Sequence, residues 1–155
     1  MRARASIQYA RIRTTFATMI EQPRLIETRL ATLERGLADL VEVRFKPEVR
    51  LDAEGIGEIV RAKHQLCANS AADVLMVLPA DIDFDLSVLA IDHHAVNGGC
   101  GLARRLAFAA QSPFNERLAR IYFRYHPRLE ETVVFLEEAD ARAWLTQGMP
   151  QPSLS

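Results

Sequence analysis

The distribution of apolar residues predicts a buried strand near the middle of the chain. Residues Val74 to Leu78 form an unbroken apolar run of strand length with no charge inside it. A strand without a polar face is typical of the centre of a parallel sheet that helices cover on both sides. Pro79 then ends the strand, because proline has no N–H for the ladder. We therefore expect the polar loop from Ala80 to Asp85 at the carboxyl edge of the sheet, where open α/β folds usually bind ligands.

The patterns before this strand predict a hairpin followed by a helix. Residues 40–45 alternate strictly between apolar and polar, which predicts a strand with one buried and one solvated face. Residues 26–36 are interpreted as its antiparallel partner, although they also fit a helix. Asp52 is a good N-cap for an amphipathic helix over residues 53–68. The stripe expected to face the sheet consists of Ile56, Ile59, Val60, Lys63 and Cys67.

Strands and helices alternate through the rest of the chain. The expected elements are a helix at 86–95, a strand at 105–110, a helix at 113–125, a strand at 132–136 and a helix at 137–147. The inward residues of the last two helices are predicted to be Phe114, Leu118, Ile121, Tyr122 and Tyr125, and then Ala141, Trp144 and Leu145. The order β-β-α-β-α-β-α-β-α predicts an α/β fold with a mixed, mostly parallel sheet, an N-terminal antiparallel hairpin and helices packed on it.

Length and composition indicate one domain. The chain has 155 residues, of which 49% are hydrophobic and 25% are charged, as in an ordinary globular protein. We expect a single domain over residues 25–148, a flexible basic arm over 1–24 and a mobile tail over 149–155. The first 20 residues contain four arginines and no acid. This composition also fits a transit peptide, or an extension upstream of a start at Met19.

Charge and cysteine content narrow the class of protein. A formal net charge of −1 gives no general reason to expect nucleic-acid binding. The two cysteines, Cys67 and Cys100, lie far apart and form no CxxC motif, which indicates a reducing compartment. No apolar run approaches the roughly 20 residues that span a bilayer. We therefore expect a cytoplasmic protein with no transmembrane segment and no nucleic-acid partner.

Three stretches of the chain carry a family resemblance. They are Val43 to Asp52 with its strand, turn and helix cap, the central strand with its Asp-rich loop, and Ile121 to Leu145, where an apolar strand leads through an acidic turn into a helix. On these stretches, the chain from Thr28 to Leu145 resembles the SpoIIAA-like proteins, which are relatives of the STAS domains of anti-sigma-factor antagonists.

The resemblance implies regulation by binding. In STAS domains the phosphorylatable serine lies in an Asp-Ser-Ser-Gly turn directly after the central strand. The corresponding residues here are Asp85, Leu86, Ser87 and Val88, so that leucine stands at the first serine and valine at the glycine. The resemblance therefore implies that the usual phosphoserine switch is absent, unless a shift in register places Ser87 at that position.

The Asp-rich loop and the helix starts contain the candidate site residues. Asp81, Asp83 and Asp85 are spaced like the first half of an EF-hand calcium loop, but Leu86 takes the position of the required glycine and no helix precedes the loop. A serine at a helix start, such as Ser87 or Ser112, could help the helix N-terminus to hold an anion. The alternative for each serine is a cap that satisfies the local backbone.

No metal, cofactor or catalytic set is expected. His93 and His94 are adjacent, so on a helix their side chains point about 100° apart and cannot jointly bind one metal ion. Cys100 lies in a glycine-rich loop and could be a reactive thiol, but the sequence supplies no base to activate it.

Three functions remain in competition. The first is a non-enzymatic regulatory or protein-interaction module, with a protein partner or a second copy of the chain, and its surface consists of Asp81, Asp83, Asp85, Leu86, Ser87, Ser112 and Asn115. The second is a carrier for a small apolar or anionic, phosphorylated molecule between the helices at 86–95 and 113–125. A carrier needs an apolar pocket of roughly 300–1,000 Å³, whereas an interaction module can be solid. The third is a hydrolase-type enzyme that uses Cys100.

Overall fold

The computed structural model describes residues 24–68, 70–98 and 103–147. Residues 1–23 of the predicted arm, the predicted tail and Cys100 lie outside these ranges.

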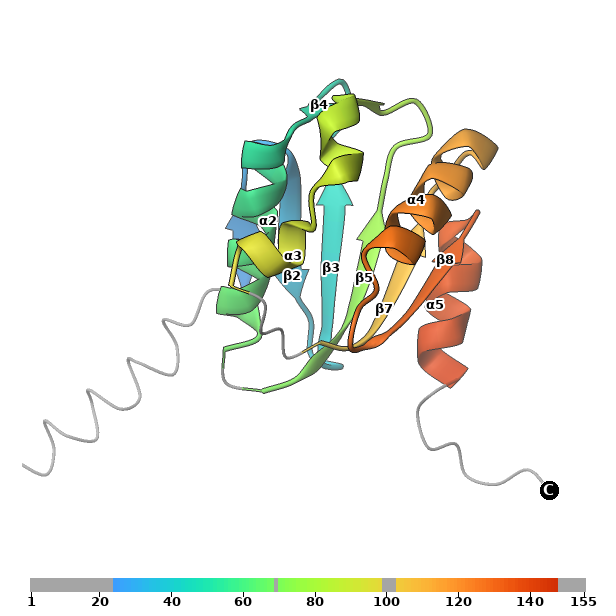
Figure 1. The fold of residues 1–155 in the computed structure, drawn as a ribbon. Helices are drawn as coiled ribbons and strands as arrows, with labels where there is room; N and C mark the ends of the chain where they lie inside the picture. The colour runs from blue at the N-terminus through green and yellow to red at the C-terminus, as the bar shows by residue number, and fades with distance from the viewer. Residues whose placement is uncertain (1–23, 69, 99–102, 148–155) are drawn as a thin grey trace, which may run out of the picture.

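A six-stranded sheet forms the middle layer of the fold (Figure 1). Its spatial order is β1-β2-β3-β5-β7-β8, in which β1, β2 and β3 pair antiparallel and the remaining neighbours pair parallel. This arrangement confirms the predicted mixed, mostly parallel sheet with an N-terminal antiparallel hairpin. The strands are β1 (Leu25–Glu27), β2 (Ala31–Arg35), β3 (Leu40–Phe45), β5 (Ala72–Val77), β7 (Ala103–Ala109) and β8 (Glu131–Phe135).

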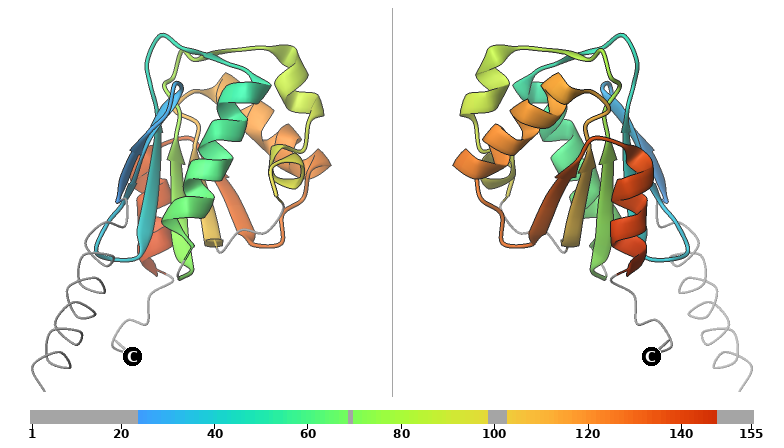
Figure 2. Two further views of the ribbon diagram at one scale, coloured as in Figure 1. Left: turned by 90° about the vertical axis from the view of Figure 1, so that its left-hand side faces the viewer. Right: turned by 90° about the vertical axis from the view of Figure 1, so that its right-hand side faces the viewer.

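Helices cover both faces of the sheet unequally. The helical elements are α2 (Ala53–Leu66), η1 (Leu86–Ala90), α3 (His93–Val96), α4 (Pro113–Tyr125) and α5 (Glu138–Gln147). The first four lie on one face, while α5 lies alone on the other, as the two side views of Figure 2 show. A second, two-stranded parallel sheet of β4 (Arg50–Leu51) and β6 (Asp83–Phe84) lies at the carboxyl edge of the main sheet and was not predicted.

The predicted helix over residues 86–95 is wrong in form, because the segment contains two separate helical turns. The carboxylate of Asp85 accepts a hydrogen bond from the Ser87 amide and begins η1, a 3₁₀ turn. The carboxylate of Asp92 accepts one from the Ala95 amide and begins α3. Ile91, between the two turns, is extended at φ −107° and ψ 129°. An N-capping aspartate inside an apolar segment is therefore the signal that this helix is broken.

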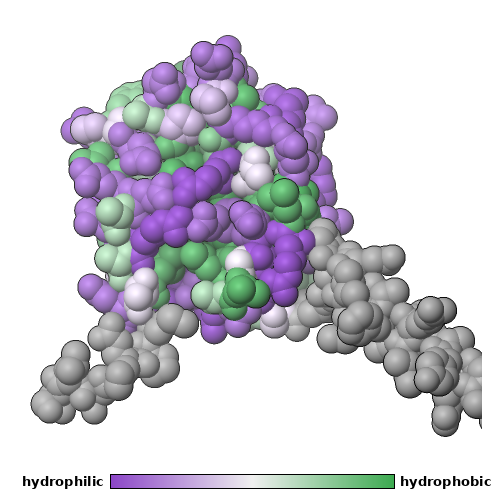
Figure 3. Space-filling view, turned by 180° about the vertical axis from the view of Figure 1, so that it is seen from behind, coloured by the Kyte–Doolittle hydropathy of each residue, from purple (hydrophilic) through white to green (hydrophobic). Residues whose placement is uncertain are grey.

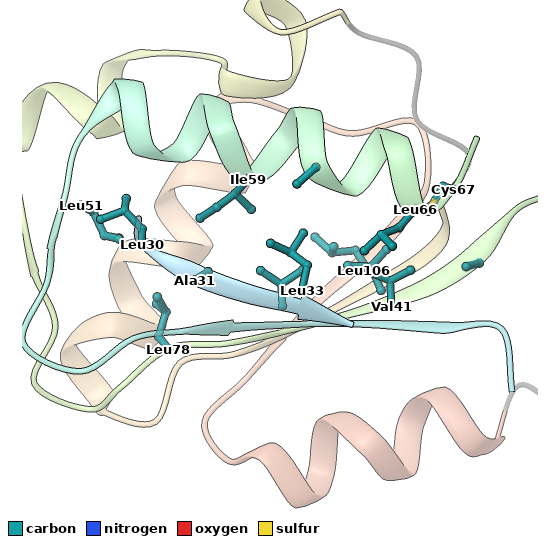
Figure 4. Packing of buried hydrophobic residues seen from close by; sticks show 14 residues of the cluster. Leu30, Ala31, Leu33, Val41, Leu51, Ile59, Leu66, Cys67, Leu78 and Leu106 are labelled. Carbon is teal, nitrogen blue, oxygen red and sulfur yellow. The ribbon is translucent and has the colours of Figure 1, made fainter. Parts of the chain in front are cut away.

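The main core lies between the sheet and α2. Figure 4 shows Ile59 and Leu66 on α2 directed toward Leu33, Val41 and Leu106 of the sheet. The predicted inward stripe of this helix is confirmed, since Ile59, Val60, Lys63 and Cys67 are buried and Ile56 is half-buried.

The central strand β5 is buried on both faces, as its sequence predicts. Val74 packs in the core under α2, whereas its neighbour Leu75 packs against α5 with Ala141 and Leu145. Both β5 side chains have no exposed surface. Successive residues of a strand point to opposite faces, so an apolar run of this length requires cover on each side.

The sheet face behind β3 is polar, as the alternating pattern predicts. Val41 and Val43 are fully buried, whereas Arg44 on the opposite face is exposed. Hydrophilic side chains cover much of the molecule seen from behind (Figure 3). Arg44 Nη2 lies 2.7 Å from Glu138 Oε2, and Arg142 Nη2 lies 2.7 Å from Glu42 Oε1. These charged contacts connect β3 to α5.

Trp144 is half-buried rather than largely buried. Its ring lies 5.9 Å from the Phe135 ring and 5.3 Å from the Arg105 guanidinium carbon. Leu145, in contrast, is only 5% exposed. The residues that hold α5 on the sheet are therefore Ala141 and Leu145, with Trp144 at the margin.

We expect Leu145→Ala to destabilise the fold by about 2–4 kcal/mol, because a buried leucine leaves a cavity on truncation. Trp144→Ala should cost less, about 1–2 kcal/mol, because part of its area already faces water. Urea unfolding followed by far-UV circular dichroism measures both losses of stability. Tryptophan fluorescence would not serve, because the chain has one tryptophan and Trp144→Ala removes it. A larger cost for Trp144→Ala than for Leu145→Ala would contradict this packing.

Candidate functional site

The Asp-rich loop lies at the carboxyl edge of the sheet, at the top of Figure 1. Asp85 Oδ1 accepts a hydrogen bond from the Ser87 amide at 3.0 Å, and this contact lowers the pKa of the Asp85 carboxyl. Asp83 Oδ1 accepts one from the Phe84 amide at 2.9 Å, and its other oxygen lies 3.9 Å from Arg50 Nε. Asp81 is exposed. Two of the three carboxylates therefore bond to the backbone of the loop itself, and the loop presents an acidic margin to solvent.

Asn115 is not a surface residue, so that part of the predicted site is wrong. Its side chain is 4% exposed, and its amide nitrogen lies 3.1, 3.2 and 3.0 Å from the carbonyl oxygens of Pro79, Ala80 and Ala110. These carbonyls follow β5 and β7, where the ladder ends and backbone acceptors need other donors. Asn115 therefore connects two strand ends to the start of α4.

Ser112 is the N-cap of α4, as its capping alternative predicts. Its hydroxyl accepts a hydrogen bond from the Asn115 amide at 3.1 Å. Proline follows it at the first helical position, where the missing N–H is not needed.

The apolar stripe predicted for α4 is also partly wrong. Phe114, Ile121 and Tyr125 are 64%, 42% and 75% exposed. The helix instead turns Asn115 and Ala119 into the protein. The side-chain amide of Asn115 thus sets the rotation of α4, and a pattern of apolar residues does not reveal it.

Apolar side chains of η1 and α4 are exposed at the carboxyl edge. Leu86, the first residue of η1, is 74% exposed. The exposed ring of Phe114 lies 6.3 Å from the half-buried ring of Phe84 on β6. We define the carboxyl-edge surface as Asp81, Asp83, Phe84, Asp85, Leu86 and Phe114.

A cavity of about 150 Å³ lies beneath the helices on this face. Side chains of both sheets and of α2, η1, α3 and α4 line it and leave it partly open, and most are apolar, among them Phe45, Ile59, Met76, Val88, Phe108 and Phe123. Pockets for drug-sized ligands are at least twice as large, which disfavours bulky cargo in this cavity. An apolar cavity of this size can hold a molecule such as benzene.

One end of the cavity is polar and contains a buried lysine. Lys63 on α2 is 2% exposed and lines the cavity, and its Nζ forms no hydrogen bond or ion pair with another described residue. Burial, together with the nearby Arg128, lowers the pKa of Lys63 to about 8. The signal for this group was present in the sequence, since Lys63 occupies the stripe predicted to face the sheet.

Two histidines near Lys63 also have buried ring nitrogens without a partner among the described residues. They are Nε2 of His64 on α2 and Nε2 of His94 on α3. Their rings meet edge to face at 5.5 Å. Burial lowers the pKa of both, that of His94 to about 4. Both rings are therefore neutral at pH 7.

Other polar groups of this region are already bonded. His93 Nε2 lies 2.7 Å from the Val88 carbonyl oxygen, and the His93 amide donates to the Tyr122 hydroxyl at 3.1 Å. Arg128, which lines the cavity, is hydrogen-bonded and paired with Glu130. Across the described ranges, no cluster of three or more His, Cys, Asp or Glu side chains could hold a metal ion.

A family model described as "Domain of unknown function (DUF7793)" matches residues 36–148, from the turn before β3 to the end of α5. The chain belongs to the DUF7793 family. This DUF7793 domain is similar in structure to an uncharacterized protein of the DUF3478 family with a SpoIIAA-like fold, from Shewanella loihica PV-4. The TM-score is 0.50 at 18% identity, and the likeness covers 77% of this chain and 98% of that one.

The structural likeness confirms the SpoIIAA-like resemblance at the level of the fold. No curated protein matches the DUF7793 chain. Among its described helices, none has the length and apolar character to cross a membrane.

The buried lysine gives a pH-dependent prediction for stability. In the unfolded chain Lys63 keeps its proton up to the ordinary lysine pKa of 10.5, whereas in the fold it loses the proton near pH 8. Between these values the unfolded state binds more protons, so Lys63 makes the fold more stable as the pH rises. We expect Lys63→Met to be more stable than wild type at pH 7, and this advantage to shrink by about 2 kcal/mol between pH 8 and pH 10.

Chemical unfolding at several pH values measures this difference. The matched control is Lys46→Met, because Lys46 and Lys63 are the two lysines of the chain and Lys46 Nζ forms a surface pair with Glu27 at 2.8 Å. The Lys46→Met substitution should change the free energy of unfolding by less than about 1 kcal/mol. If the difference in stability between Lys63→Met and wild type does not change with pH, the pKa of Lys63 is not lowered in the fold and the prediction is contradicted.

Proposed function

We propose that this chain is a non-enzymatic protein-interaction module that binds its partner through the carboxyl-edge surface. The observation that supports this most is Leu86, a large apolar side chain that is 74% exposed at the start of η1. In the family resemblance, this is the position of the phosphorylatable serine. A leucine there cannot be phosphorylated, so the surface would be permanently competent to bind.

The chemistry of the surface indicates the partner. Leu86 and Phe114 offer apolar contact, and anchors of this kind contribute most of the binding energy at protein interfaces. Asp81 and Asp83 lie exposed around them, and complementary charge favours a partner with basic residues. We infer a protein that presents an apolar side chain flanked by lysine or arginine. Two copies of this chain would bring acidic margins together, which disfavours a homodimer through this surface.

The test compares Leu86→Asp with a matched variant, Leu37→Asp. Leu37 is 94% exposed in the turn between β2 and β3, away from the carboxyl edge. A tagged protein would capture partners from the lysate of its own host, and a captured protein would then be purified and its affinity measured by calorimetry.

Wild type and Leu37→Asp should bind the purified partner equally, and Leu86→Asp should bind it at least tenfold more weakly, as for loss of a central apolar anchor. A partner that binds all three proteins alike would contradict the proposed surface. Self-association abolished by Leu86→Asp would replace the predicted partner with a second copy.

A further inference from the structure

The polar end of the cavity leaves hydrogen-bonding groups without partners among the described residues. His94 Nε2 is a buried ring nitrogen without a partner among the described residues, and Lys63, which comes from a different helix, lines the same cavity. Helices α2 and α3, which carry these two residues, lie side by side on the front of the sheet (Figure 1). Buried polar groups in native proteins nearly always have a partner, so each such group needs an explanation.

The charges around this end of the cavity favour a ligand that carries a single negative charge. Arg128 and Glu130 form a pair with side chains only 11% and 9% exposed, so these two charges compensate each other. His64 and His94 are neutral at pH 7, because burial lowers the pKa of each ring. Among the described residues around the cavity, Lys63 therefore remains as the single uncompensated charge. A carboxylate balances it, whereas a phosphate would bring excess negative charge into a buried site.

The remaining walls favour an apolar body. Phe45, Met76, Phe108 and Phe123 belong to the apolar lining. A volume of about 150 Å³ admits a ring or a short alkyl chain and excludes a long acyl chain.

We propose that this cavity binds a small monocarboxylic acid of about the size of benzoate. Its carboxylate accepts hydrogen bonds from the Lys63 ammonium and from Nε2–H of His94, and its apolar body lies against the aromatic and aliphatic walls. The cavity shares Phe84 with the carboxyl-edge surface, but Lys63 and His94 lie outside that surface, so a test of these two residues does not decide the proposed protein partner.

Calorimetry with benzoate and hexanoate, each paired with its alcohol, tests the carboxylate. Benzyl alcohol and 1-hexanol keep the apolar body and remove the charge. The acids should bind wild type at least tenfold more tightly than the alcohols. In Lys63→Met this preference should disappear while the alcohols still bind, which also shows that the variant is folded. Lys46→Met should behave as wild type.

Labelling the lysine side chains with ¹³C gives a direct second measurement, because the chain contains only two lysines. Benzoate should raise the pKa of Lys63 and leave the Lys46 signal unchanged, since a bound anion favours the charged ammonium. Benzyl alcohol should not raise it. The proposal is overturned if neither acid binds at millimolar concentrations, if acids and alcohols bind equally, or if Lys63→Met binds the acids as wild type does.

Discussion

One buried amide determines how the functional face of this protein is built. The side chain of Asn115 bonds to backbone carbonyls that follow β5 and β7, and its own backbone amide is bonded by the α4 cap. The loop after β5, the end of β7 and the start of α4 are thereby held at one point. An unsatisfied buried carbonyl costs about 1–3 kcal/mol, so the local arrangement depends on this residue. The position of α4 then fixes both the exposed edge and one wall of the cavity.

The two candidate sites share a short element. Within η1, Val88 is buried and lines the cavity, whereas Leu86, two residues earlier, is exposed on the carboxyl-edge surface. Hydrogen bonds hold η1 in place, because the carbonyl oxygens of Val88 and Leu89 are paired with ring nitrogens of His93 and His126. The surface that would meet a partner is therefore supported by contacts made beside the cavity.

The sequence predicts those features that local chemistry determines. Strand β3 follows from strict alternation, β5 from an apolar run, and α2 from the cap at Asp52, because each depends on neighbours in the chain. The features that depend on distant partners were missed or misassigned. The rotation of α4 depends on carbonyls that are brought to Asn115 by the fold, and the β4–β6 pair joins residues 33 positions apart. Lys63 was placed correctly in the buried stripe, but its lack of a partner is visible only in three dimensions.

The central claim is that Asn115 holds α4 against the two strand ends. Hydrogen exchange measured by mass spectrometry on Asn115→Leu tests it directly, because leucine keeps the branched shape of the side chain and removes both donors. Protection should fall in α4 and in residues 80–82 by more than in α5, which lies on the opposite face of the sheet. Equal losses in α4 and α5, or no loss in α4, would contradict the claim.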